Sequence, residues 1–263
     1  MGGIAGIVDW SEPVSREAAD AMAVILSSRG PDGAGSFDAP DARLRYRQRA
    51  VVPCHVQQPV VADDVVVLMD GWLYDHERIA LAVGHDPTGQ CDAHTLLAAW
   101  RRWGAELGRH LEGEYAAAVW DRRAKVLTLL RDRLGTRPLF WARVGSKLVF
   151  ASEVPAVLAS GEVPARLARD RVAEYLSFQS VHAPRTLLEG VYQVEPAHWL
   201  MADPTGHRTQ PWWRPSYRPS SRPEAERIEA LEAAVAQSVA RRVPDGVEAG
   251  ILLSGGLGSA AIA

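Results

Sequence analysis

The sequence has 263 residues, of which 47% are hydrophobic, so it is long enough to bury the core of one large domain or of two small ones. Its formal net charge of -3 at pH 7 gives no reason to expect nucleic acid or an anionic membrane as a partner. A small-molecule or peptide substrate fits this balance better. The apolar run at residues 65–69 is far shorter than the roughly 20 residues that cross a bilayer, so no membrane segment is expected.

The N-terminus and the two cysteines indicate where the protein is located and whether it binds a metal through thiols. The first residues show no basic stretch followed by a long apolar core, so export is not expected and a cytoplasmic location is. Cys54 and Cys91 lack the spacing of metal ligands, and neither has an evident paired base. Both are expected to be reduced thiols in the core or in a loop.

Strands and short helices are predicted in turn along the first hundred residues. A buried strand is expected at residues 4–9, followed by a helix from a Ser15 cap to about residue 27. A turn rich in glycine and proline covers 28–33, and strands are expected near 43–52 and 64–71. Asp75 and Asp92 are each placed to cap a short helix.

The second half of the chain predicts an antiparallel sheet. Residues 115–152 give four strands separated by turns, and further strands are expected at 190–194, 198–202 and 207–213. Helices are expected near 153–159 and 170–177. Because strands and helices occur in blocks, the pattern favours an α+β layered structure over a parallel doubly wound sheet.

A domain boundary is expected at residues 214–223, where three prolines interrupt a stretch with little to bury. Residues 1–213 then form the first domain. Residues 224–263 contain an amphipathic helix to about residue 242, a buried strand at 250–253 and a Gly-rich loop. These pieces cannot form a core alone, so the second domain is expected to be cut off near its beginning.

The Gly-rich loop, considered alone, has two possible interpretations. A strand that ends in Ser254-Gly255-Gly256 exposes backbone N–H groups that suit a phosphate, particularly where a helix follows. An ordinary Gly-rich turn after a strand explains the same residues equally well.

Eight short segments, in order and spacing, resemble the asparagine synthetase family, which joins a class II glutamine amidotransferase domain to an ATP-cleaving synthetase domain. The segments are Gly3-Ile4-Ala5-Gly6-Ile7, Arg29-Gly30-Pro31-Asp32, Asp70-Gly71-Trp72-Leu73-Tyr74-Asp75, Trp120-Asp121, Arg131-Asp132-Arg133-Leu134-Gly135, Pro138-Leu139, Phe150-Ala151-Ser152-Glu153 and the loop at 254–259. The resemblance implies an N-terminal nucleophile hydrolase-like αββα fold of four layers, with two antiparallel sheets, for residues 1–213. It makes 224–263 the beginning of an ATP pyrophosphatase-like α/β domain.

The resemblance also implies that the glutamine-cleaving site is degenerate, with no catalytic residue left. Family members use a cysteine at position 2 as the nucleophile, with its own α-amine as the base. This chain has Gly2, so removal of Met1 would expose an amine but no thiol. The family's oxyanion-binding Asn-Gly pair is Asp70-Gly71 here, and an ionised aspartate accepts hydrogen bonds instead of donating them.

The remaining glutamine-binding positions are altered as well. Trp72 stands where the family has a glutamate that holds the substrate amine, and it fills volume without carrying charge. Asp92 matches a substrate-amine aspartate, although a helix cap is the favoured interpretation. The family arginine that binds the substrate carboxylate aligns with Arg49 or with Arg47, and the sequence does not choose between them.

ATP and Mg²⁺ are implied for the second domain. The resemblance assigns nucleotide contacts to Leu252, Ser254, Gly255, Gly256, Leu257 and Ser259. Gly258 replaces the family aspartate that organises the pyrophosphate and its metal, so no metal ligand is assigned within the chain. The loop could cradle phosphate with its backbone, whereas its metal-linked chemistry is in doubt.

Three functions follow from these observations. The first is an ATP-dependent, AMP-forming ligase that makes an amide bond without glutamine, as in β-lactam synthetases and lasso peptide cyclases. The second is a truncated, non-catalytic homologue that acts as a scaffold or binding domain. The third, glutamine hydrolysis alone, lacks a nucleophile. A homodimer and a separate synthetase subunit are both open as partners.

Overall fold

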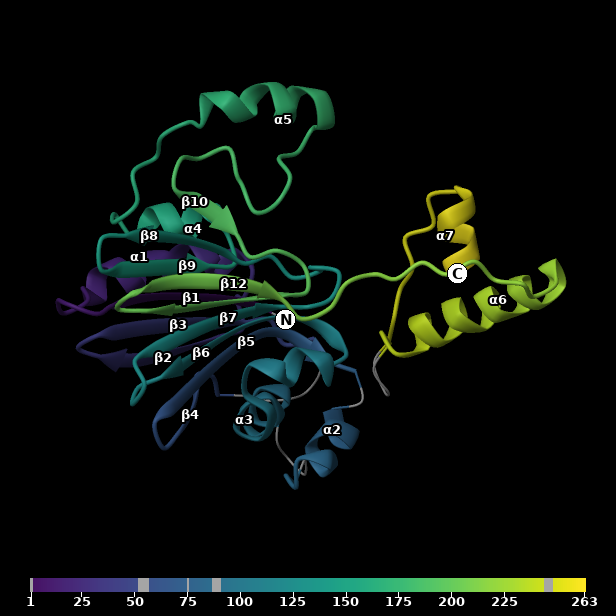
Figure 1. Ribbon diagram of the computed structural model, residues 1–263, viewed down its shortest axis with the longest axis horizontal. Coiled ribbons are helices and arrows are strands. Elements are labelled where there is room, and N and C mark those ends of the chain that lie inside the picture. Colours follow the sequence, from purple (N-terminus) through teal and green to yellow (C-terminus); the bar gives the residue numbers. More distant parts are fainter. Residues whose placement is uncertain (1, 52–56, 75, 87–90, 244–247) are drawn as a thin grey trace. The chain divides into compact units, whose positions relative to one another are not determined.

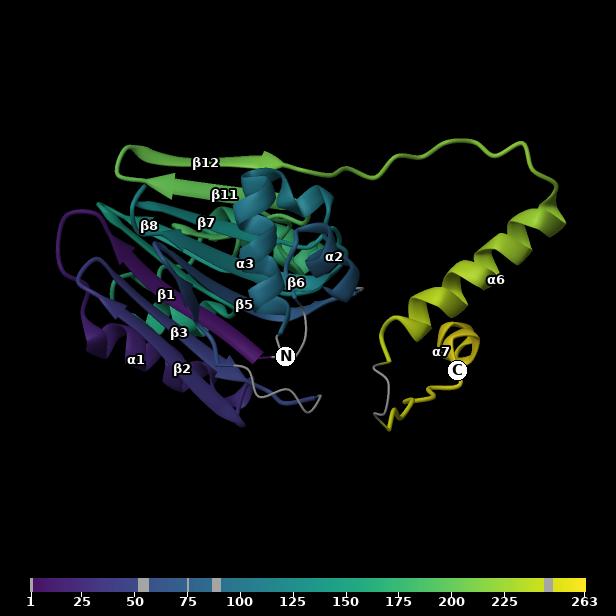
Figure 2. The same ribbon diagram turned by 90° about the horizontal axis from the view of Figure 1, so that it is seen from below.

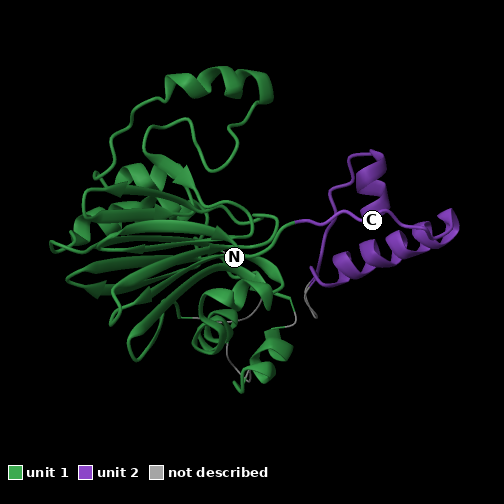
Figure 3. Cartoon of the chain, viewed as in Figure 1, with its two compact units in different colours: residues 1–214 green, residues 215–263 purple. Residues whose placement is uncertain are grey.

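The computed structural model describes residues 2–51, 57–74, 76–86, 91–243 and 248–263, and it divides the chain into two compact units, residues 1–214 and 215–263 (Figure 3). Cys54 and the predicted helix cap Asp75 lie outside the described residues. Among the helices that are described, none has the length and apolar character needed to cross a membrane.

Unit 1 is built on two six-stranded sheets. The first sheet contains β1 (Gly2–Asp9), β2 (Gly33–Ala39), β3 (Ala42–Gln48), β8 (Phe140–Val144), β9 (Lys147–Ala151) and β10 (Val191–Gln193), in the spatial order β10-β8-β9-β1-β3-β2. The second contains β4 (Val60–Ala62), β5 (Val65–Leu73), β6 (Gly113–Asp121), β7 (Val126–Arg131), β11 (His198–Asp203) and β12 (Gly206–Pro211), in the order β12-β11-β7-β6-β5-β4. All pairings between these described strands are antiparallel.

Helices cover the outer face of each sheet (Figures 1 and 2). The first sheet is covered by α1 (Arg16–Ile25) and α4 (Val154–Ala159), and the second by α2 (His76–Ala82) and α3 (Asp92–Trp103). Within the described residues, three 3-10 helices, η1 (Leu26–Ser28), η2 (Gly104–Arg109) and η3 (Arg169–Arg171), connect longer elements. The helix α5 (Val172–Phe178) has no buried residue and projects away from the layers in Figure 1.

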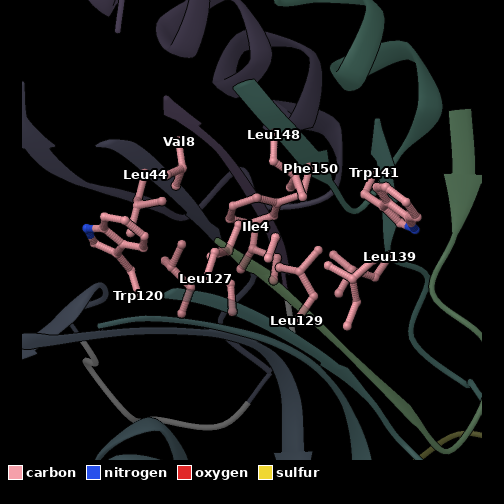
Figure 4. Close-up of a cluster of buried hydrophobic side chains, with 14 of the residues drawn as sticks. Ile4, Val8, Leu44, Trp120, Leu127, Leu129, Leu139, Trp141, Leu148 and Phe150 are labelled. Carbon is pink, nitrogen blue, oxygen red and sulfur yellow. The ribbon is translucent and has the colours of Figure 1, made fainter. Parts of the chain in front are cut away.

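Three apolar clusters show how the layers are held together. One lies between the two sheets and includes Ile4 and Val8 of β1 and Leu129 of β7 (Figure 4). The alternate residues of β1, Ala5 and Ile7, belong to a second cluster with α1 and α4. The third joins the outer face of the second sheet to α2 and α3. This period-two alternation gives a strand with both faces buried, and the predicted four-layer α+β fold is confirmed.

Element by element, the predictions for unit 1 hold except at two edge strands. The helices expected near 153–159 and 170–177 are present as α4 and α5. Strands β2 and β4 were not predicted, since β2 has the sequence GAGSFDA and β4 is only three residues long. Both are edge strands of their sheets. An edge strand needs only one partner, so its sequence carries a weak hydrophobic pattern.

Unit 2 contains α6 (Glu224–Ala240) and α7 (Leu257–Ile262), and none of its described residues is buried. The buried strand predicted at 250–253 is wrong. These residues form no strand, and the side chain of Leu252 is 98% exposed. An isolated extended segment cannot satisfy its backbone or bury its apolar side chains without a neighbouring strand, and the described part of unit 2 supplies none.

Candidate functional site

The predicted site residues Gly2 and Asp70 meet where the first residue of β1 approaches β5. Gly2 belongs to the first sheet and Asp70 to the second. The backbone N–H of Gly2 donates a hydrogen bond of 2.7 Å to Oδ1 of Asp70. Asp70 shares a strand face with Leu68 and Val66, which lie in the apolar cluster between the sheets. The two sheets are therefore joined by a polar contact at the end of their common core.

Arg29, which follows η1, completes this contact. Its Nη2 donates to Oδ2 of Asp70 at 3.0 Å, and its Nε donates to the carbonyl oxygen of Gly2 at 2.9 Å. Its Nη1 lies 3.5 Å from a carboxylate oxygen of Glu153. Arg29 and Glu153 both lie in family-like segments, but the sequence alone assigns their side chains no role. The one feature of the sequence that could have indicated this contact is that each of the two family-like segments contains a charged residue.

Gly2 is confined by the strand beside it. It pairs with Gln48 of β3, and a Cβ atom built on Gly2 would lie 1.9 Å from the carbonyl oxygen of Arg47. Real Cβ atoms do not approach a backbone oxygen this closely, so a side chain at position 2 requires the backbone to move. The position lacks both a nucleophilic atom and the space for one.

Gly71 keeps the conformation that only glycine adopts easily. Its φ angle is +126°, and a Cβ atom there would lie 1.8 Å from the carbonyl oxygen of Glu114 on β6. The backbone at the predicted oxyanion position is thus of a kind that needs glycine. The neighbouring side chain, Asp70, carries two accepting oxygens where the family has an amide donor.

Trp72 is partly buried, and its ring makes an edge contact with Tyr74 at a centroid distance of 6.5 Å. Because residues 70 and 72 point to the same face of β5, Trp72 lies beside Asp70. Its indole ring occupies the position at which the family resemblance predicts a carboxylate.

The interpretation of Asp92 as a helix cap is wrong. The N-cap of α3 is Cys91, and Asp92 is the first helical residue. Its Oδ2 accepts a hydrogen bond of 2.7 Å from the backbone N–H of Leu73, so it fastens the end of β5. Burial raises the pKa of Asp92, although the bond from Leu73 and the nearby His76 act in the opposite direction.

The two candidate arginines point to different parts of the fold. Arg47 donates from Nε to the carbonyl of Ala23 on α1, over the outer face of the first sheet. Arg49 donates to the carbonyls of Ser28 and Arg29, at the end of η1. Arg49 therefore binds the backbone at the end of η1, beside Arg29, whereas Arg47 holds α1 against the first sheet.

The expectation that Cys91 has no paired base is also wrong. Its Sγ lies 3.2 Å from Nδ1 of His94, one turn along α3. Burial and the nearby His85 lower the pKa of His94, which favours the neutral imidazole. The Cys91 residue is only 9% exposed and packs in the apolar cluster under α3. The three-residue spacing of Cys91 and His94 at the start of a predicted helix could have indicated this pair from the sequence.

The residues assigned to ATP do not form a nucleotide site by themselves. Leu252 and Leu257 are 98% and 93% exposed, so they provide no wall for an adenine ring. The hydroxyls of Ser254 and Ser259 lie 3.0 Å apart and contact each other. In the part of the chain that the structure describes, no group of three or more His, Cys, Asp or Glu side chains could hold a metal ion. The Gly-rich segment here does not fit ATP·Mg²⁺ without further protein.

Comparison with known proteins shows which family has this architecture. A family model described as a glutamine amidotransferase domain matches residues 1–213. The chain belongs to this family. The amidotransferase domain and the residues after it are 29% identical over 273 aligned positions to asparagine synthetase [glutamine-hydrolyzing] 3 of Bacillus subtilis (strain 168), with coverage of 100% of this chain and 44% of that protein. They are also 29% identical over 250 positions to amidase chyE of Penicillium rubens, covering 91% of this chain and 37% of that protein.

Two solved structures resemble the amidotransferase domain in fold. The allosteric regulatory enzyme of purine biosynthesis gives a TM-score of 0.60 at 16% identity, covering 99% of this chain and 62% of that chain. Glutamine phosphoribosylpyrophosphate amidotransferase from B. subtilis gives 0.57 at 15% identity, covering 95% and 60%. At these identities the likeness shows the N-terminal nucleophile hydrolase-like fold alone. The chain spans less than half the length of the two curated relatives named above.

Proposed function

We propose that this chain is the amino-terminal part of an asparagine-synthetase-type, ATP-dependent ligase whose amidotransferase domain does not hydrolyse glutamine. The observation that carries the proposal is the contact between Gly2 and Asp70. Position 2 supplies a backbone N–H and no sulfur, and both oxygens of Asp70 are engaged by Gly2 and Arg29. A donor for a developing oxyanion is thus replaced by a buried carboxylate, and loss of one such donor alone costs about 10²–10³ in rate.

The ligase part of the proposal rests on the family and on the length of the relatives. This chain covers 44% and 38% of the lengths of two curated relatives named as asparagine synthetases, so both extend well beyond the matched region. We infer that ATP and Mg²⁺ would be held by sequence following residue 263, with the loop contributing backbone N–H groups. An amine on the substrate itself would then take the place of ammonia, and a small molecule or a peptide would carry it.

The second candidate is a non-catalytic scaffold or binding domain. Gly258, which removes the loop's carboxylate, favours it. The coding DNA after residue 263 distinguishes the two functions. An in-frame synthetase domain, or one encoded by the adjacent gene as a separate subunit, supports the ligase, whereas its absence from both places supports the scaffold. A homodimeric assembly and a cytoplasmic location stay predictions of the ligase hypothesis.

The nitrogen source provides the biochemical test. The protein extended through the synthetase region should release pyrophosphate from ATP with an amine-bearing carboxylate substrate, and adding glutamine should not change the rate. Pyrophosphate release that depends on glutamine would contradict the proposal, because the amidotransferase domain would then be delivering ammonia.

A further inference from the structure

Three hydrogen bonds close a ring at the start of β1. Gly2 donates to one oxygen of Asp70, Arg29 donates to the other, and Arg29 also donates to the carbonyl of Gly2. The N–H and the C=O of Gly2 are both used, and so are both oxygens of Asp70. The ring joins β1 of one sheet to β5 of the other and involves the residue after η1.

Because the ring is buried, its charged groups must be satisfied by partners within the protein. The side chain of Asp70 has no exposed surface and that of Arg29 is 23% exposed. A carboxylate removed from water is tolerated when an opposite charge and hydrogen-bond donors satisfy it, as Arg29 and Gly2 do here. If either partner is lost, a buried charge is left partly uncompensated, which destabilises the fold more than loss of a surface ion pair does.

Space around the ring is equally restricted. The Cβ position of Gly2 meets the carbonyl oxygen of Arg47 at 1.9 Å, and that of Gly30 meets the carbonyl carbon of Arg47 at 2.5 Å. Two glycines therefore allow β1 and the turn after η1 to pack directly against the backbone of β3. No side chain fits at either position in this arrangement.

We propose that the Gly2–Asp70–Arg29 ring is a structural clasp, in which residues at the altered glutamine-site positions lock the two sheets together. This inference rests on the proposed loss of glutamine hydrolysis. In the clasp the nitrogen of Gly2 acts as a hydrogen-bond donor and not as a base. An amide N–H serves this role as well as a terminal ammonium does, so the clasp does not require a free amino group at position 2.

Matched glycine substitutions test the clasp. Gly2→Ala should lower the melting temperature by about 5 °C or more, because the added methyl group collides with the Arg47 backbone. Gly3→Ala is the control, since its Cβ lies 3.4 Å from the Leu26 side chain, an ordinary contact, and its melting temperature should stay within about 2 °C of the wild type. Equal shifts for the two variants would overturn the assignment.

Two further variants test the hydrogen bonds and the role of the nitrogen. Asp70→Asn should speed amide hydrogen exchange in both β1 and β5, because one acceptor facing Arg29 or Gly2 becomes a donor. A short Gly-Ser extension before Met1 should leave exchange in β1 unchanged. Unchanged exchange in Asp70→Asn, or lost protection in the extended chain, would each contradict the clasp. Glutamine hydrolysis is measured separately, so failure of the clasp and failure of the proposed function give different results.

Discussion

At the scale of single residues, Asp9 shows how a buried carboxylate anchors the far end of β1. Its Oδ1 accepts hydrogen bonds from the backbone N–H groups of Ser11 and Glu12 and from the hydroxyl of Ser146. Burial alone would raise the pKa of Asp9, but these bonds and the charge of Lys147 outweigh it, and the pKa is lowered. The ionised form is therefore the form that the fold stabilises.

The pH dependence of this contribution has a definite sign. A carboxyl whose pKa is lower in the folded state stabilises the protein above its unfolded pKa of about 3.8 and loses that effect as the pH falls through the folded value. Asp9→Asn should lower the free energy of unfolding by roughly 1–3 kcal/mol at pH 7. The difference from wild type should stay nearly constant above about pH 4 and shrink as the pH falls below it. Denaturant unfolding measured across this range checks it, and a constant difference would show that ionisation of Asp9 is irrelevant.

At the scale of elements, α3 owes its position to one apolar face. Leu96 is fully buried between α3 and the second sheet, whereas Leu81 at the end of the neighbouring α2 is 70% exposed. Burying a leucine side chain contributes roughly 1.5–3 kcal/mol, and removing it also leaves a cavity. The same substitution should therefore have very different effects at the two positions.

Leu96→Ala should lower the free energy of unfolding by about 2–5 kcal/mol, and Leu81→Ala by less than about 0.5 kcal/mol. Chemical denaturation of the two variants is the measurement. A small effect at Leu96 would mean that α3 can leave the sheet without cost to unit 1. Cys91 and His94 are on this helix, so the Leu96 result also reports on how firmly that pair is held.

Predictability from sequence differs among these elements for physical reasons. The period-two pattern of β1 and the apolar runs of β5 and β6 specify central strands, because both faces of each must be buried. The strand expected at 250–253 has the same apolar character and is absent, since a strand also needs a neighbour that its own sequence does not contain. Gly2, Asp70 and Trp72 could be identified as altered positions from the family-like segments. Arg29, which binds Gly2 and Asp70, and His94, which contacts Cys91, could not be assigned roles, because those contacts depend on how η1 and α3 pack.

At the scale of the whole molecule, the two units differ in how much they bury. Unit 1 has three apolar clusters, while none of the described residues of unit 2 is buried. Limited proteolysis should cut first between Arg214 and Arg222, which are exposed and precede α6. Mass spectrometry of the early fragments identifies the site. Protection of this stretch, with early cleavage inside residues 115–152, would show that the boundary lies elsewhere.

Nucleotide binding is expected to be weak for the chain alone. Because the loop at 254–259 lacks walls and a carboxylate, isothermal titration with ATP·Mg²⁺ should show a Kd no tighter than about 1 mM, the affinity of a marginal contact. Saturable binding at micromolar concentrations would mean that residues 215–263 form a site without further sequence.

Hydrolysis of glutamine by the purified chain is the decisive measurement for the proposal that Gly2 and Asp70 disable the glutamine-cleaving site. We expect glutamate release equal to a buffer blank for the wild type, for Gly2→Cys and for Cys91→Ser. Gly2→Cys should stay inactive because Asp70 still faces the site and a side chain collides with the Arg47 carbonyl. Hydrolysis by the wild type above the blank would contradict the proposed loss of glutaminase activity. Its loss in Cys91→Ser would identify Cys91, beside His94, as the nucleophile.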